Sequence, residues 1–142
     1  MKKHIIITSI TLLLVLLLSA CSTSDRILAK QMTEKYSDDQ NYVTFTGEVI
    51  EYEDGYVVIK CEELKNYIHY EDDFCAYLIF WEQIIELSVG DQIEFVTVPF
   101  HFYNGHLLPI VEIKKDGITL LSFEDGKDNL IHWVNMTFNK QN

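Results

Sequence analysis

Two histidines flank the dipeptide Asn104-Gly105, which is the clearest turn signal in the chain. A two-residue hairpin turn there would pair His106 with Tyr103 and place His101 diagonally on the same face of the hairpin. One metal ion could reach both rings, but a zinc site needs a third and usually a fourth ligand. Only Glu112 could supply another, and only if its strand bends. We therefore expect two partly hydrated histidines, with no metal and no other cofactor.

Two cysteines lie within the stretch that is rich in strand-forming residues. Cys61 and Cys75 fall near the ends of neighbouring predicted strands. A disulfide between them would close the acidic loop that separates them, whereas two reduced thiols would behave as small buried apolar side chains. The sequence leaves both alternatives open. A nucleophilic cysteine needs a partner base, and no such pairing can be identified, so we expect no catalytic cysteine.

The third cysteine, Cys21, ends a segment with the order of a targeting signal. A basic start at residues 1–4 precedes an apolar run from Ile5 to Leu18, and the sequence Leu-Ser-Ala-Cys follows at residues 18–21. This segment resembles the lipobox signal peptide of bacterial lipoproteins. The resemblance implies that residues 1–20 are removed and that Cys21 carries acyl chains of the palmitate kind. The protein would then be held by a lipid anchor at the extracytoplasmic face of the cell membrane.

Charge narrows the range of partners. The chain has 22 acidic and 11 basic residues and a net charge of −11. Nucleic acid is disfavoured, because binding to phosphates needs clustered Lys and Arg. The acidic runs, such as residues 71–73, lack the spacing of a calcium loop. We interpret them as a solvated acidic surface that resists aggregation.

Length and composition predict one folded domain after a linker. A 142-residue chain suits a single domain, and 48% hydrophobic residues exclude a disordered one. Residues 21–41 are polar at both ends and lack strand alternation. A short helix over Asp25–Tyr36 could form there, with Ile27, Leu28 and Met32 as a thin apolar stripe. We expect this segment to be a lipid-anchored spacer, and residues 42–142 to be the β-rich domain.

Strand-forming residues dominate from Tyr42 onward. A turn at Asp54-Gly55 would pair Tyr52 with Val57 and Ile50 with Ile59, and would direct all four towards the core. The isolated Gly47 indicates a bulge or a bend, and Pro99 indicates a sheet edge or a bulge. The predicted strands are Tyr42–Glu53, Tyr56–Glu62, Tyr67–Tyr70, Phe74–Trp81, Gln92–Tyr103, His106–Lys115 and Ile118–Phe123.

The chain ends in an ambiguous segment. A turn is expected at Glu124–Lys127. Asp128–Phe138 could then be a capped helix, with Leu130, Ile131 and Val134 on one side, or a last strand.

The order of these elements over Tyr42–Lys115 resembles an OB-fold. The features that carry the resemblance are a bent first strand, a hairpin, a third strand and a helical turn at Glu82–Leu87. The turn sequence Leu-Ser-Val-Gly-Asp at residues 87–91 then leads into a long fourth strand. The resemblance implies a mainly β fold, with a small antiparallel barrel closed by the fifth strand and a possible short C-terminal helix. A generic antiparallel sandwich is the alternative.

These features favour binding over catalysis. The Asn104-Gly105 hairpin would project a tip suited to recognition, made of Phe102, Tyr103, His106 and Leu107. We expect a membrane-anchored binding module for a protein or an envelope component. One alternative is a defensive exclusion or immunity lipoprotein that blocks an incoming toxin or phage component. A small envelope hydrolase is another, although no catalytic motif is present.

Overall fold

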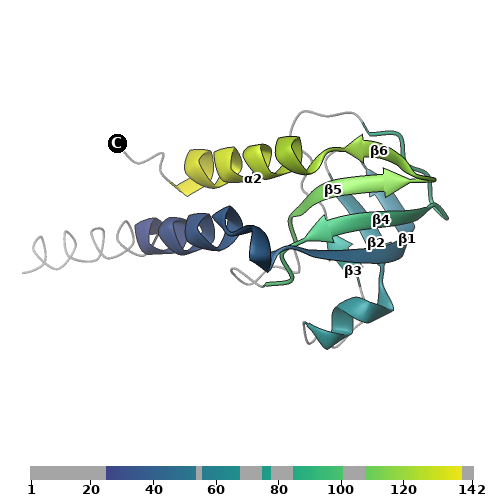
Figure 1. Cartoon of the computed structure of the whole chain (residues 1–142), viewed down its shortest axis with the longest axis horizontal. Helices are drawn as coiled ribbons and strands as arrows, with labels where there is room; N and C mark the ends of the chain where they lie inside the picture. The colour runs from purple at the N-terminus through teal and green to yellow at the C-terminus, as the bar shows by residue number, and fades with distance from the viewer. Residues whose placement is uncertain (1–24, 54–55, 68–74, 78–84, 101–107, 139–142) are drawn as a thin grey trace, which may run out of the picture.

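The computed structural model describes residues 25–53, 56–67, 75–77, 85–100 and 108–138 (Figure 1). An α-helix over residues 25–37 comes first. The elements after it are the 3-10 helix η1 (Asp39–Asn41), β1 (Val43–Glu53), β2 (Tyr56–Lys60), the 3-10 helix η2 (Glu62–Asn66), β3 (Cys75–Tyr77), β4 (Gln92–Thr97), β5 (Ile110–Lys115), β6 (Ile118–Leu121) and α2 (Phe123–Phe138).

The strands form one six-stranded sheet in the order β3-β2-β1-β4-β5-β6, and every pair is antiparallel. A closed barrel would need the fifth strand to return to the third. Instead, the Asp116-Gly117 turn brings β6 onto the outer edge of β5. The sheet is therefore open, and the predicted closed barrel is wrong. The antiparallel sheet itself is confirmed, but the two α-helices make the fold a mixed one rather than a mainly β one.

A β-bulge in β1 changes the predicted register. Tyr52 pairs with Val57 as expected, but the register shifts between Val49 and Glu51, so that Val49 pairs with Ile59. Val49 is fully buried, whereas Ile50 is 39% exposed. The prediction that Ile50 faces the core is wrong, because an extra residue in one strand moves the following side chains to the other face.

The strand ends follow the turn chemistry of the sequence. Asp116 has a φ of 52° and Gly117 a φ of 78°, so the predicted two-residue turn between β5 and β6 is confirmed. β4 ends at Thr97, two residues before Pro99, and does not extend to Tyr103 as expected. Proline cannot donate a hydrogen bond to a neighbouring strand.

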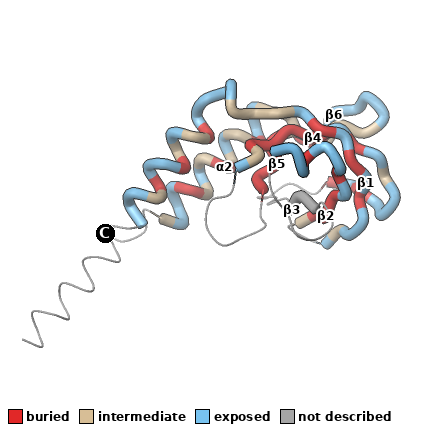
Figure 2. The backbone as a smooth tube through the Cα atoms, turned by 90° about the horizontal axis from the view of Figure 1, so that it is seen from below, coloured by how far each residue is buried: buried red, intermediate tan, exposed pale blue. Residues whose placement is uncertain are grey.

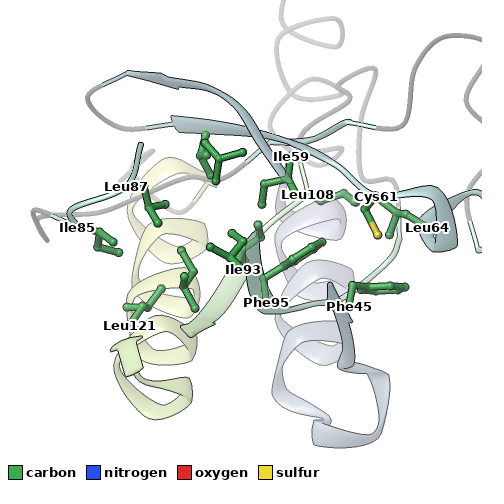
Figure 3. Packing of buried hydrophobic residues seen from close by; sticks show 14 residues of the cluster. Phe45, Ile59, Cys61, Leu64, Ile85, Leu87, Ile93, Phe95, Leu108 and Leu121 are labelled. Carbon is green, nitrogen blue, oxygen red and sulfur yellow. The ribbon is translucent and has the colours of Figure 1, made fainter. Parts of the chain in front are cut away.

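The main hydrophobic core lies on one face of the sheet and is continuous from β2 to β6 (Figure 3). The Phe45 and Phe95 rings lie 5.7 Å apart at its centre, on the neighbouring strands β1 and β4. Residues from outside the strands complete this core; they are Cys61, Leu64, Ile85, Leu87 and Leu108.

A second core joins the sheet to the two helices (Figure 2). Ala29, Met32 and Tyr36 of helix 25–37 are buried there together with Leu130 and Val134 of α2. A spacer would expose such side chains. Residues 21–41 are expected from the sequence to be only a spacer between the membrane and the domain. The structure differs, because helix 25–37 belongs to the folded unit. Of the expected stripe, Met32 is buried but Ile27 is 54% exposed.

Hydrogen bonds fasten the end of helix 25–37 to the rest of the fold. Its last three carbonyl groups would otherwise lack partners within the helix. They accept hydrogen bonds from three side chains: Asn41 Nδ2 to the Lys35 carbonyl (2.9 Å), Tyr42 Oη to that of Tyr36 (2.8 Å) and Lys127 Nζ to that of Ser37 (3.2 Å). Because Lys127 lies near the start of α2, this contact sets the two helices antiparallel and side by side (Figures 1 and 2).

The C-terminal segment is a helix, and it begins earlier than predicted. The backbone N–H of Asp125 donates to Ser122 Oγ (3.3 Å), and the Ser122 hydroxyl donates to the Asp125 carboxylate (2.6 Å). This cap starts α2 at Phe123, so the expected turn at Glu124–Lys127 is wrong. Leu130 and Val134 are buried as the helical alternative requires, and the alternative of a last strand is excluded.

Candidate functional site

The predicted recognition tip lies outside the described residues, as do both histidines considered as metal ligands. Phe102, Tyr103, His106 and Leu107 all fall in the stretch 101–107, together with His101, and Cys21 falls in residues 1–24. The assignments of the tip and of the lipid anchor therefore stay predictions.

One flank of this stretch is held to the sheet, and the other contacts helix 25–37. The buried Thr97 hydroxyl donates to the Pro109 carbonyl (2.6 Å), and Leu108 is fully buried. On the other flank, the ammonium group of Lys35 lies 5.0 Å from the centre of the Phe100 ring. Both flanks of stretch 101–107 therefore lie at the end of the sheet where helix 25–37 enters.

The described cysteine does not have the properties of a nucleophile. Cys61 is a free, buried thiol in the main core. Burial raises its pKa, and the backbone hydrogen bonds from Leu64 and Glu63 only partly oppose this effect. A thiol with a raised pKa holds its proton at neutral pH. Cys75 pairs with Lys60 in the backbone register, and its side chain lies outside the described part.

Among the described residues, no group of three His, Cys, Asp or Glu side chains could hold a metal ion. His132 is the one histidine in that part of the chain, and it is exposed on α2.

The acidic side chains of the first hairpin are solvated. Glu51 and Glu53 are exposed. Tyr56 Oη donates to the Glu51 carboxylate (2.9 Å), and this hydrogen bond is the largest reason that the pKa of Tyr56 lies above its ordinary value. The arrangement agrees with a solvated surface in this part of the chain. The other predicted acidic run, residues 71–73, lies outside the described residues.

The end of the sheet opposite the helices is built from two turns, which we call the outer end: Ser88–Asp91 before β4, and Lys115–Ile118 between β5 and β6 (Figure 1). The Asp91 carboxylate accepts hydrogen bonds from the Ser88 backbone N–H (2.8 Å) and from Lys115 Nζ (2.6 Å). Lys115 is the main cause of a lowered pKa of Asp91. This ion pair holds the two turns together.

Backbone hydrogen bonds dock the first of these turns on β1. The Gly90 N–H donates to the Val49 carbonyl (2.7 Å), and the Val49 N–H donates to the Asp91 carbonyl (2.9 Å). Gly90 has a φ of 94°, which favours glycine. The turn is thereby held rigidly against the bulged part of β1.

Each turn of the outer end exposes one large aliphatic side chain. Val89 is 68% exposed and Ile118 is 65% exposed, more than any other large hydrophobic side chain in the described ranges. Sequence reasoning did not single out either residue. The sequence signal for them is an apolar residue within a turn. A turn lies on the surface and offers such a side chain little to pack against, so the side chain is expected to be exposed.

Neither α-helix in the described ranges has the length and apolarity needed to cross a membrane. Comparison of the chain with protein families, with curated proteins and with solved structures gives no match.

Proposed function

We propose that this protein is a lipid-anchored binding module on the extracytoplasmic face of the cell membrane, and that its outer end is presented to a partner. The proposal combines the lipobox at residues 18–21 with the arrangement of the folded unit. The observation that carries it is that the helix pair and the outer end lie at opposite ends of the molecule (Figure 1).

The spacing from the anchor favours this orientation. Only residues 22–24 separate Cys21 from helix 25–37. Four peptide steps span at most about 14 Å, so the start of the helix must stay close to the lipid. The described part of this helix, residues 25–37, is about 20 Å long. It therefore holds the sheet at a distance from the membrane, with the outer end farthest away.

The outer end suits a partner that offers an apolar patch with basic groups around it. Its centre is the aliphatic pair Val89 and Ile118. Residues 38–128 contain 20 of the 22 acidic residues of the chain but only five Lys and no Arg. Electrostatic complementarity then favours a protein or an envelope component with basic side chains or amines at the rim, and it disfavours nucleic acid.

The pKa shifts of the titratable groups also favour a binding function over a catalytic one. The lowered pKa of Asp91 and the raised pKa of Lys114 arise from ion pairs with neighbouring side chains. Such shifts come from structural ion pairs as readily as from active sites. In the described residues the buried thiol of Cys61 has a raised pKa, which is opposite to the requirement for a nucleophile.

The test is partner capture by chemical cross-linking on intact cells that carry the full chain. The double variant Val89→Ser/Ile118→Ser should reduce the yield of the captured partner at least tenfold relative to the parent. The control Ile50→Ser removes an exposed apolar side chain that belongs to neither turn and should leave the yield unchanged. A yield that persists in the double variant but falls in Tyr103→Ala/His106→Ala would move the binding site to the predicted tip.

A further inference from the structure

We infer that the far end of the helix pair rests on the lipid surface, so that the protein stands on the membrane through a second, non-covalent contact beside its anchor. This inference depends on the proposed lipid anchor. The contact surface consists of Ile27 and Met136, supported by the ring pair of Trp133 and Phe138. We call it the membrane-facing end.

The helix register brings the two exposed side chains to the same height. Lys127 contacts the Ser37 carbonyl where the helices meet the sheet. Ile27 is ten residues before Ser37, and Met136 is nine residues after Lys127. At 1.5 Å per residue, both lie about 14–15 Å along the antiparallel pair from this junction. Ile27 is 54% exposed and Met136 is 43% exposed, so each helix of the pair carries one exposed apolar side chain at this height.

An aromatic pair lies beside Met136. The rings of Trp133 and Phe138 meet edge to face, with centroids 5.9 Å apart, and both side chains are half-buried. A half-buried tryptophan has an apolar body and an N–H group at its edge, which is why this residue is enriched where lipid headgroups meet water.

Charge distinguishes this end from the rest of the molecule. The last ten residues of α2, Asn129–Phe138, contain no Asp, Glu, Lys or Arg. Helix 25–37 carries three basic residues against two acidic ones. The remaining segment, residues 38–128, holds the other 20 acidic residues. An anionic lipid surface would repel the sheet and accept the helix end, so the charge distribution orients the molecule in the same sense as the anchor.

The short connection to the anchor makes lipid the occupant of this surface. The lipidated Cys21 would sit at the headgroup boundary, and at most about 14 Å of chain separates it from Asp25. A partner protein, or a second copy of this chain, would have to fit between the helix end and the bilayer. The lipid itself is already within that distance.

Site-specific photo-cross-linking in cells that express the full chain tests this contact. p-Benzoylphenylalanine replaces Ile27 or Met136 in separate variants. The matched controls carry it in place of Val89 or Ile118, which are exposed to at least the same degree. After illumination, the adducts are identified by mass spectrometry. The expected result is phospholipid adducts at positions 27 and 136, at least fivefold more abundant than at 89 and 118.

Three outcomes would overturn the inference. Equal phospholipid yields at all four positions would show that the helix end has no preferred contact with lipid. Protein adducts at positions 27 and 136, including adducts to a second copy of this chain, would show that a protein covers it. If the parent chain is found in the soluble fraction and no position yields lipid, the anchor is absent. In that case the proposed function fails together with the inference, whereas the first two outcomes leave the anchor intact.

Discussion

The Lys127 ammonium group lies 3.2 Å from the Ser37 carbonyl oxygen, and it also pairs with the Asp39 carboxylate, so that one side chain joins two segments almost 90 residues apart. A cation at the C-terminal end of a helix complements the partial negative charge of the helix there. This contact, with the shared core beneath it, makes helix 25–37 part of the domain rather than a linker in front of it.

Loss of the buried thioether side chain in helix 25–37 should destabilise the whole domain. Met32 is 4% exposed in the second core. Met32→Ala should lower the free energy of unfolding by about 2–4 kcal/mol, because it removes buried methylenes and leaves a cavity. Ile27→Ala in the same helix should change it by less than about 0.5 kcal/mol. Urea unfolding measures both, and equal small effects would mean that the helix is a spacer after all.

Because of the bulge in β1, truncation of two neighbouring residues should have different effects on stability. Val49 is fully buried, and Ile50 is exposed. Val49→Ala should cost about 2 kcal/mol of stability, since two buried methyl groups are lost. Ile50→Ala should cost much less. In the regular register predicted from the Asp54-Gly55 turn, Ile50 would face the core, and Ile50→Ala would be the more destabilising change. Thermal unfolding of the two variants therefore distinguishes the bulged register from the regular one.

Gly126 should reject even a methyl group. A Cβ atom there would lie 2.0 Å from the Val111 carbonyl oxygen, because α2 packs directly on the backbone of β5. Gly126→Ala should therefore destabilise the fold by about 1–3 kcal/mol, although the same change in a free helix stabilises by about 1 kcal/mol. Asp128→Ala, at an exposed position of α2, is the control. A gain in stability for Gly126→Ala would refute this packing.

The ion pair of the outer end should make stability depend on pH. Because the folded state lowers the pKa of Asp91, the pair contributes fully above the ordinary carboxyl pKa of about 4. That contribution is lost as the pH falls through the lowered folded-state pKa. Asp91→Asn should thus lower the unfolding midpoint at pH 7, and the difference from the parent should shrink at pH 3.

A charge control accompanies this experiment. Asp116→Asn removes an exposed carboxylate from the adjacent turn without removing the Lys115 contact. If it lowers the midpoint at pH 7 as much as Asp91→Asn does, the effect comes from net charge and not from the ion pair.

The sequence predicts those strand and turn features that depend on the backbone preferences of neighbouring residues. The Asp116-Gly117 turn and the pairing of Tyr52 with Val57 both follow from backbone preferences. The bulge at Ile50 could not be predicted, because it depends on the docking of the Ser88–Asp91 turn on Val49 from another part of the chain.

Two further differences arise from packing over long sequence distances. Gly126 reads as a turn residue, yet it lies in a helix, and the close approach of β5 explains why this helix residue is a glycine. Gly47 reads as a bulge, yet a Cβ atom there would lie 2.4 Å from Ile59 Cγ2, so close approach of β2 explains the glycine. Of the proposed site, the acidic surface could be predicted from composition. Val89 and Ile118 could not, because only the fold shows that their two turns meet.

Mass spectrometry of the mature protein extracted from membranes tests the central claim most directly. If the protein is a lipid-anchored module, its N-terminal residue is Cys21, with a diacylglyceryl group on the sulfur, and the described part of helix 25–37 starts four residues later. In Cys21→Ser this lipidated species should be absent and the chain should leave the membrane fraction. A mature chain that begins at another residue, or that carries an unmodified Cys21 thiol, would contradict the account.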